Sequence, residues 1–155
     1  MKSYRTPHAF AAAAVVLTAA VLAGCAPKDL AAERHGAYQA YQAGAYAEAA
    51  ERFDRLVGEI PRDAELWFRL GNAHAKAMNP KKAIEAYENA LLRDPEMAKA
   101  WYNMGLIYMH AALKTFIDME AYRGDDDPIG REGRLMREHL LEILDSPPSA
   151  DGHDG

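Results

Sequence analysis

The side chains that carry out catalysis or bind metals in proteins are scattered along this chain. None of the six histidines has the i, i+4 spacing of a metal-binding pair on one helix face. There is a single cysteine, Cys25, and no glycine-rich loop of the phosphate-cradling type. The three aspartates at 125–127 lack the alternating ligands and the distal glutamate of a calcium loop, so a solvated acidic turn is favoured. The sequence therefore predicts no metal site, no cofactor and no enzymatic activity.

Cys25 stands in a context that predicts a different chemistry, the attachment of lipid. Residues 1–8 are polar with two positive charges, and residues 9–23 form an apolar run. This is the layout of a signal peptide, and the run is too short to span a membrane comfortably. Residues 22–25 read Leu-Ala-Gly-Cys, which resembles the lipobox of bacterial lipoproteins. The resemblance implies that residues 1–24 are removed and that Cys25 carries a diacylglycerol thioether. The alternative is an ordinary buried thiol.

The expected lipid would tether the chain to a membrane through residues 25–29. Each buried methylene contributes about 0.8 kcal/mol, so the multiple acyl chains of such lipoproteins should anchor the protein firmly. In Gram-negative lipoproteins an aspartate directly after the cysteine favours inner-membrane retention, whereas here Ala26 follows. The resemblance implies a bacterial envelope protein, with the periplasmic side of the outer membrane as the expected location. A Gram-positive or unsorted location stays open.

The charge balance argues against nucleic acid as a partner. The chain has 18 Lys and Arg against 23 Asp and Glu, a net charge of −5. Loss of residues 1–24 would remove Lys2 and Arg5, leaving 16 basic against 23 acidic residues, or about −7. Nucleic-acid binding needs basic side chains gathered on one face. Because one cysteine allows no internal disulfide, stability must come from a buried core, and the length suits one domain.

Similar residues recur at a spacing of 34 positions. The pairs are Ala49 with Ala83, Phe53 with Tyr87, Pro61 with Pro95, Trp67 with Trp101, Leu70 with Met104, and Gly71 with Gly105. A period of that length is typical of stacked helical hairpins, which cannot bury their apolar faces alone. The sequence therefore predicts an all-α fold, a short solenoid of antiparallel helical hairpins over residues 30–131.

The middle unit, residues 64–97, has the most complete pattern. Its characteristic residues are Trp67, Leu70, Gly71, Ala83, Tyr87, Ala90 and Pro95. They are the signature residues of the tetratricopeptide repeat, which this segment resembles, with His74 where the family usually has tyrosine. Gly71 would let a second helix approach closely, and Ala83 is the small residue opposite it. Residues 79–80 should end the first helix and start the second. His74 is expected to be a core histidine satisfied by a neighbour.

The flanking units keep only half of that pattern. Residues 30–63 retain the second helix, and a helix over residues 31–43 is expected before it, with the degenerate sequence common in terminal repeats. Residues 98–131 retain the first helix but lose the signature of the second and the turn between them. Residues expected to pack in this first helix are Trp101, Met104, Gly105 and Tyr108. Its apolar stripe continues at spacings of three and four, which predicts one long helix over about 98–122; a break near Ala112 is the alternative.

A further helix is predicted at the C-terminal end. Asp127 is placed as its N-cap and Pro128 as its first residue. An amphipathic stripe over residues 129–145 is expected to cover the end of the solenoid. That stripe consists of Leu135, Met136, His139, Leu140, Ile143 and Leu144. Residues 146–155 are predicted to be a disordered tail.

The resemblance to tetratricopeptide repeats also implies a groove lined by the first helix of each unit. Carried over by position, its residues are Arg34, His35, Tyr38, Tyr41, Gln42, Glu65, Phe68, Arg69, Asn72, Lys76, Lys99, Tyr102, Asn103, Leu106, Met109 and His110. The residues expected to hold a carboxylate or backbone are Arg34, Arg69, Lys76, Lys99, Asn72 and Asn103, with Tyr38, Phe68 and Tyr102 as apolar anchors. The set is only partly similar to the carboxylate clamp of chaperone-binding relatives, because Tyr38 stands where an asparagine belongs. The alternative is a set of solvated surface residues.

Together these features predict a membrane-anchored scaffold that binds a segment of a protein partner in its groove. It would support assembly of an envelope complex such as a pilus, a secretin or a secretion system; pilotins and Tad pilus assembly proteins are lipoproteins of this class. Two alternatives stay open. The C-terminal amphipathic helix would be the docking element, with the repeats as support, or the chain would be a non-catalytic subunit of an envelope enzyme. The sequence leaves the oligomeric state open.

Overall fold

In the computed structural model the described residues are 29–123 and 127–146, and all their regular elements are α-helices. By its internal contacts the chain divides into two units, Met1–Ala31 and Ala32–Gly155. The helices are α2 (Leu30–Gln42, which begins in the first unit), α3 (Tyr46–Glu59), α4 (Ala64–Lys76), α5 (Pro80–Leu91), α6 (Ala98–Glu120) and α7 (Pro128–Asp145). Cys25, the expected signal segment, and residues 147–155 of the expected tail lie outside the described residues. Within those residues, no helix combines the length and the apolar character needed to cross a membrane.

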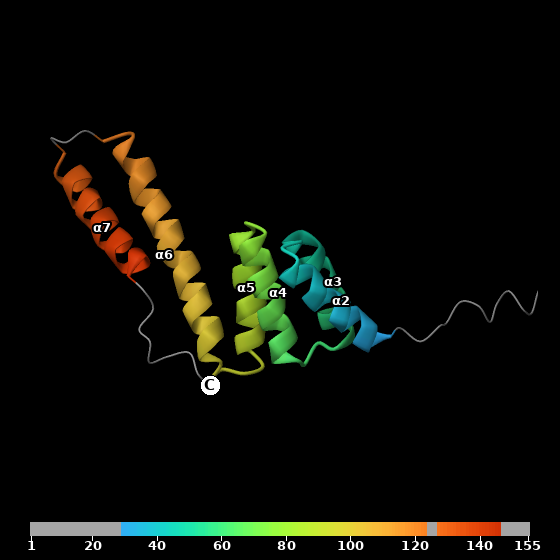
Figure 1. Ribbon diagram of the computed structural model, residues 1–155. Helices are drawn as coiled ribbons and strands as arrows, with labels where there is room; N and C mark the ends of the chain where they lie inside the picture. Colours follow the sequence, from blue (N-terminus) through green and yellow to red (C-terminus); the bar gives the residue numbers. More distant parts are fainter. Residues whose placement is uncertain (1–28, 124–126, 147–155) are drawn as a thin grey trace, which may run out of the picture. The chain divides into compact units, whose positions relative to one another are not determined.

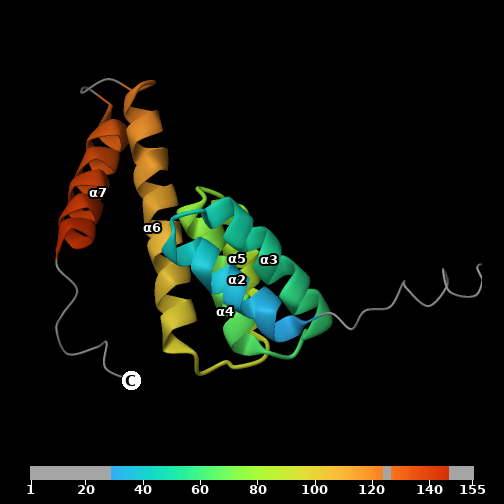
Figure 2. The same cartoon turned by 45° about the vertical axis from the view of Figure 1, so that its right-hand side comes forward.

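Neighbouring helices along the chain pack side by side, α3 on α4, α4 on α5, α5 on α6 and α6 on α7 (Figures 1 and 2). This is the series of helical hairpins that the 34-residue period predicts. Local signals set the helix ends. Asp63 caps α4 by accepting a hydrogen bond from the Leu66 N–H at 3.1 Å, and Pro80 opens α5, where its missing N–H costs nothing.

Two of the turns use left-handed backbone. Gly44, between α2 and α3, has a φ of 77°, and Met78, between α4 and α5, has a φ of 60°. Glycine adopts this conformation freely, whereas for a methionine it costs about 1 kcal/mol. The Met78 side chain points outward and is 85% exposed. The turn lies where Asn79 and Pro80 predict it, between Lys76 and Pro80, whereas the left-handed conformation of Met78 was not predicted.

The core of the unit runs between α3 and α6. Its largest fully buried side chains are Phe53, Leu56, Leu66 and Tyr87. Tyr87 of α5 lies on Gly71 of α4, where an added Cβ would stand 2.5 Å from two ring carbons. Gly71 therefore permits the close approach of α5, as predicted.

α6 is one continuous helix, as the missing turn predicted. Its buried residues Ala100 and Met104 belong to the same core as α5. α7 packs along the C-terminal half of α6, where Gly133 lies against Met119 and Phe116. The long helix and the C-terminal helix of the predicted fold are therefore both present.

The packing face of α7 differs from the predicted one. Leu135, Met136 and Ile143 of the expected stripe are exposed, while Gly130 and Gly133 are buried. Because the two glycines carry no side chain, α7 approaches α6 most closely along the face that contains them. The prediction that the apolar stripe covers the end of the solenoid was wrong for these residues.

The expected packing of the third unit is also incomplete. Trp101 and Tyr108 are 54% and 51% exposed, and a Cβ at Gly105 would meet nothing within 4 Å. Met104 is buried as expected. The physical reason is that α6 continues straight where the second helix of the unit should begin, so within the described residues no helix returns along this face.

Candidate binding groove

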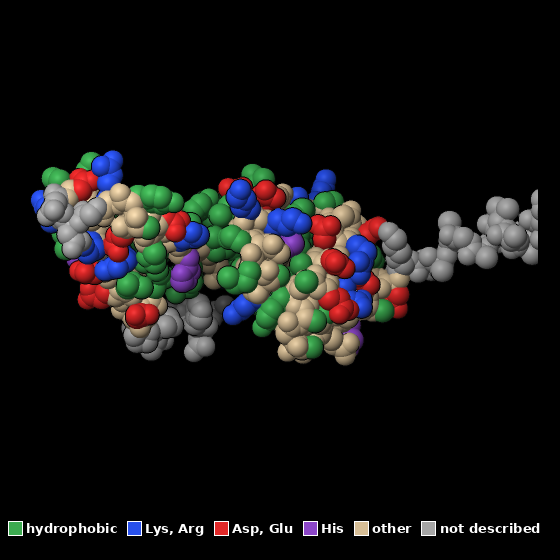
Figure 3. Space-filling model, turned by 90° about the horizontal axis from the view of Figure 1, so that it is seen from above, with side chains coloured by type: hydrophobic (Ala, Val, Ile, Leu, Met, Phe, Trp, Pro, Cys, Tyr) green, Lys and Arg blue, Asp and Glu red, His purple; other side chains and the backbone are tan. Residues whose placement is uncertain are grey.

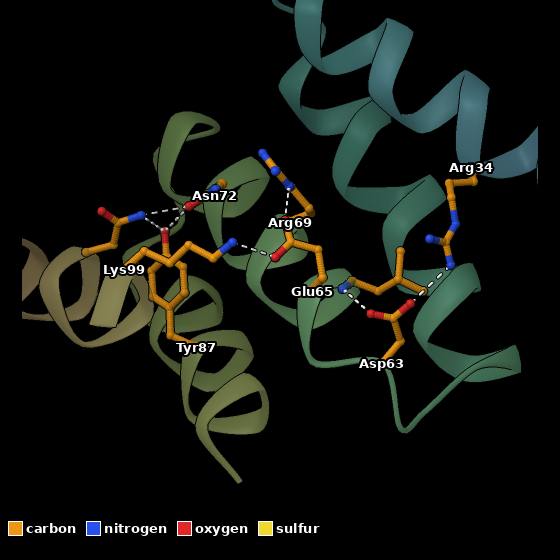
Figure 4. A network of polar contacts seen from close by, with 9 residues as sticks. Arg34, Asp63, Glu65, Arg69, Asn72, Tyr87 and Lys99 are labelled. Carbon is orange, nitrogen blue, oxygen red and sulfur yellow. Dashed lines mark hydrogen bonds and ion pairs between the residues drawn. The ribbon is translucent and has the colours of Figure 1, made fainter. Parts of the chain in front are cut away.

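The basic residues predicted to hold a partner's carboxylate are mostly paired with carboxylates of the chain itself (Figure 4). Glu65 lies between Arg69 and Lys99, and its two oxygens accept hydrogen bonds from Arg69 Nε and Lys99 Nζ, each at 2.6 Å. Arg34 donates to Asp63 Oδ2 at 3.1 Å. Three of the four expected cations thus form ion pairs within the fold, although Arg69 and Lys99 share the single negative charge of Glu65.

Two of the aromatic side chains predicted as apolar anchors, Phe68 and Tyr38, also contact other residues of the chain. Phe68 is only 5% exposed, with Lys99 Nζ 4.6 Å and the Arg69 guanidinium 5.6 Å from its ring centroid. Arg69 also stands 5.6 Å from the ring centroid of Tyr38, whose ring packs perpendicular to that of Phe53. Phe68 is therefore a core residue, and its prediction as an exposed anchor was wrong. Tyr102, at 49% exposed, remains at the surface.

Asn72, Tyr87 and Asn103 form a hydrogen-bond cluster that joins α4, α5 and α6. The Tyr87 hydroxyl donates to Asn72 Oδ1 at 2.8 Å, and Asn103 Nδ2 donates to the same oxygen at 2.9 Å. Burial raises the pKa of Tyr87 to about 12, although the hydrogen bond with Asn103 acts in the opposite direction. Because its three side chains come from three helices, the cluster holds α6 in register against the α4–α5 hairpin.

The open part of the groove lies where α6 continues past the α4–α5 turn. A hollow of about 830 Å³ is lined there by Tyr41, Asn72, Ala75, Lys76, Met78, Pro80, Tyr87, Asn103, Leu106, Ile107, His110, Ala111 and Lys114. This volume is within the usual range of ligand pockets. Its lining is mainly apolar, and no carboxylate is among these residues.

Basic groups stand along the hollow. Lys76 is exposed and makes no ion pair with any residue in the described ranges. Lys114 pairs with Asp118 at 2.5 Å, but its side chain stays 74% exposed. His110 is exposed as well. Figure 3 shows green side chains gathered in the middle of this view, between α6 and the α4–α5 hairpin, whereas red and blue ones are interleaved over α2 and α3 and again towards the α7 end.

The hollow unites only some of the predicted groove residues. Asn72, Lys76 and Asn103 line it, together with Tyr41, Leu106 and His110 of the wider set carried over by position. The predicted residues outside its lining are Arg34, Tyr38, Phe68, Arg69, Lys99 and Tyr102. Sequence reasoning missed Met78, Pro80 and Lys114 as groove residues. The missing turn at residues 112–114 was the available signal, because it extends α6 beside the α4–α5 turn.

The predicted hydrogen bond from a neighbour to His74 is not present at its Nδ1 atom, which is buried and has no hydrogen-bond partner within the described part of the chain. Burial lowers the pKa of the imidazole and Lys82 acts in the same direction, whereas Asp54 and Glu85 oppose them. His74 is therefore held towards its neutral form. Among the described residues no His, Cys, Asp and Glu side chains gather in a group that could hold a metal ion.

The fold and the groove define a short solenoid of the tetratricopeptide type. Residues 64–97 match the tetratricopeptide repeat family. The chain is 28% identical over 102 residues to Protein O-mannosyl-transferase TMTC1 of Mus musculus, and 35% identical over 65 residues to the General transcriptional corepressor trfA of Dictyostelium discoideum. These matches cover 63% and 41% of this chain but only 11% and 5% of the relatives.

Solved structures share the fold over most of the chain. The MamA RS-1 ArsTM double mutant aligns with a TM-score of 0.52 and 22% identity, over 78% of this chain and 61% of that one. PcrH in complex with the chaperone binding region of PopD aligns with a TM-score of 0.52 and 18% identity, over 79% and 98%. The Sgt2 TPR domain from Aspergillus fumigatus gives 0.51 and 18%, over 83% and 91%. Solenoids of this kind typically present concave binding surfaces rather than catalytic sites.

Proposed function

We propose that this chain is a lipid-anchored adaptor whose hollow between α4 and α6 binds a segment of a protein partner. The observation that carries the proposal is an open, mainly apolar hollow flanked by Lys76, His110 and Lys114 in a helical-repeat fold. The similarity to PcrH, solved in complex with the chaperone binding region of PopD, supports a protein segment as the ligand.

The lining indicates the chemistry of that segment. Leu106, Ile107 and Ala111 offer carbon surface for apolar side chains. Lys76 is positioned to attract a carboxylate beside them. Because Glu65 already holds Arg69 and Lys99, an acidic residue of the partner should lie at the Lys76 end of the groove rather than at the Lys99 end.

The place of action is inferred from the sequence. Cys25 would carry lipid on the periplasmic side of the outer membrane, and the adaptor would support assembly of an envelope complex such as a pilus, a secretin or a secretion system. Cys25→Ser should move the protein from the membrane fraction to the soluble fraction of lysed cells. Persistent membrane attachment of that variant would refute the anchor.

A matched pair of lysine variants tests the groove. A photo-crosslinking residue at position 106 of the full-length chain should capture the partner in its native cells, and position 117, exposed on α6 outside the hollow, serves as the control. Lys76→Glu should reduce capture at least tenfold, whereas Lys81→Glu, on an exposed lysine of α5, should not. Equal capture by the two variants would contradict binding in the hollow.

An exposed apolar row on α7 supports the second candidate, in which this helix docks onto a partner. Ile129, Met136 and Ile143 recur every seven residues and are 63%, 44% and 58% exposed. If α7 is the docking element, Met136→Asp combined with Ile143→Asp should abolish capture while Lys76→Glu leaves it intact. The opposite pattern assigns binding to the hollow.

A further inference from the structure

α6 has a second apolar face on the side opposite the hollow. At 3.6 residues per turn, Asn103, Leu106 and His110 fall on one side of the helix, whereas Trp101, Gly105 and Tyr108 fall on the other. The latter three residues are called the Trp101 face below. Between positions 100 and 113 the helix carries no Asp, Glu, Lys or Arg, so this face has no charge of its own.

The Trp101 face is the uncovered part of a longer stripe. α7 covers the continuation of that stripe through contacts with Phe116 and Met119. Figures 1 and 2 both show α7 beside the C-terminal half of α6, with no described helix on this side of the N-terminal half. The exposure of Trp101 and Tyr108, each about one half, agrees with this arrangement.

The preceding repeat shows what such a face accepts. Trp67 and Gly71 of α4 stand 34 residues before Trp101 and Gly105, and α5 covers them. The Tyr87 ring lies directly on Gly71, and Ala83 and Ala90, on the same side of α5, are completely buried. The α4–α5 contact is therefore an internal template for the occupant of the Trp101 face.

The two tryptophans are held in the same way. Trp67 Nε1 donates to the carbonyl of Pro61 and Trp101 Nε1 donates to that of Pro95, both at 3.0 Å. In the covered repeat, Arg93 completes the contact. Its guanidinium lies 4.8 Å from the Trp67 ring centroid and also donates to the Pro61 carbonyl. For Trp101, no residue in the described ranges provides this contact.

We propose that the Trp101 face binds an amphipathic helix of another protein, which takes the place that α5 takes on α4. The template defines its chemistry: a small residue, an aromatic residue four positions later, a small residue three further on, and an Arg or Lys three beyond that. These are the spacings of Ala83, Tyr87, Ala90 and Arg93.

A second copy of the chain is a poor source of that helix. Among the described helices the full spacing occurs only in α5 and its C-terminal turn, whose aromatic and small residues are buried in its own repeat. α7 has an exposed apolar row but contains no Phe, Tyr or Trp. Another copy could therefore supply the template only by opening its own core.

A peptide with the sequence of residues 79–94 is a direct probe, because it carries the complete spacing. Labelled with a fluorophore, it should bind the full chain in lipid nanodiscs saturably and in a one-to-one ratio. The same peptide with Tyr87→Ser should bind at least tenfold more weakly. Absence of saturable binding, or equal binding of the two peptides, would overturn the proposal.

Paired glycine variants locate the bound peptide. A Cβ would meet nothing within 4 Å at Gly105 or at Gly58 of α3, so Gly105→Leu and Gly58→Leu are the same change in equally open surroundings. Gly105→Leu should weaken the peptide at least tenfold, because a ring can no longer lie on the helix backbone, and Gly58→Leu should not. Binding that survives Gly105→Leu would mean that the peptide occupies another site, which overturns the assignment.

The natural occupant can be identified in cells. A photo-crosslinking residue at Tyr108 of the full-length chain should join it to a different protein, within a segment that carries the small, aromatic, small, basic spacing. The proposal would be overturned by a crosslink between two copies of this chain, by a crosslinked segment without that spacing, or by the absence of any crosslinked product. Because the hollow lies on the opposite side of α6, Lys76→Glu should leave this crosslink unchanged.

Discussion

Gly71 and Gly105 stand 34 residues apart, and the same substitution should change stability in opposite directions at the two positions. A Cβ at Gly71 would lie 2.5 Å from Tyr87 Cδ1 and Cε1, and 3.0 Å from Cζ. Tyr87 is 1% exposed and its hydroxyl is bonded to Asn72, so the ring has little freedom to move away. At Gly105 the added methyl group would meet nothing within 4 Å.

The expected free energies follow from two terms. Alanine in place of glycine inside a helix favours folding by about 0.5–1 kcal/mol. Overpacking of a well-filled core costs about 1–3 kcal/mol, and the anchored Tyr87 ring places Gly71→Ala towards the upper end. Gly71→Ala should therefore destabilise the fold by about 1–2.5 kcal/mol, whereas Gly105→Ala should stabilise it by about 0.5–1 kcal/mol.

Urea unfolding followed by circular dichroism at 222 nm measures both effects, provided that the m-values of the variants agree. Thermal midpoints should differ in the same order, by about 2–4 °C for each kcal/mol. Gly58→Ala, at another open position, serves as the control and should not destabilise the fold. A Gly71→Ala protein as stable as the wild type, or a Gly105→Ala protein less stable than it, would refute the account of the packing of both helices.

Three further predictions concern titration and charge. Raising the pH from 10 to about 12 should lower the free energy of unfolding, because Tyr87 ionises near 10 in the unfolded chain but near 12 in the folded one. In urea titrations at pH 9 and 11, Tyr87→Phe should reduce this loss, while Tyr41, whose pKa is also raised by burial, retains part of it. Lowering the pH below 6.5 should also destabilise the fold, because unfolded His74 takes up a proton before the folded form, whose pKa is lower. His74→Phe should flatten that acid limb, and an unchanged slope would exclude His74 as its source. Glu65→Gln should lower the free energy of unfolding by less than about 1 kcal/mol, since the ion pairs of Glu65 are partly exposed. The same variant should bind an acidic peptide more tightly at low salt, because Arg69 and Lys99 are released; unchanged fluorescence anisotropy of a labelled peptide would contradict this.

The helices could be predicted because their signals are local. Gly44 and Pro80 mark turns by their backbone preferences, and Asp127 does cap α7, accepting a hydrogen bond from the Ile129 N–H. The uninterrupted apolar stripe across residues 112–114 indicated one long α6 in place of a hairpin. Each of these signals depends on residues close together in the chain.

The candidate site was harder to predict because it depends on distances between helices. Of the groove residues carried over by position, Asn72, Lys76 and Asn103 line the hollow. Carrying residues over by position could not reveal that Glu65 would lie 2.6 Å from Lys99, a residue 34 positions away on another helix. It therefore could not show which of the predicted cations form ion pairs within the described part of the fold and which, like Lys76, do not.

The sequence by itself determined the repeat period, the complete repeat at residues 64–97 and the loss of the third hairpin, and it predicts the lipid on Cys25. Only the tertiary structure decided which side chains remain available, namely those of the hollow and of the Trp101 face. The physical reason is that helical periodicity sets the direction in which a side chain points. Burial and ion pairing depend instead on what the neighbouring helices bring to meet that side chain.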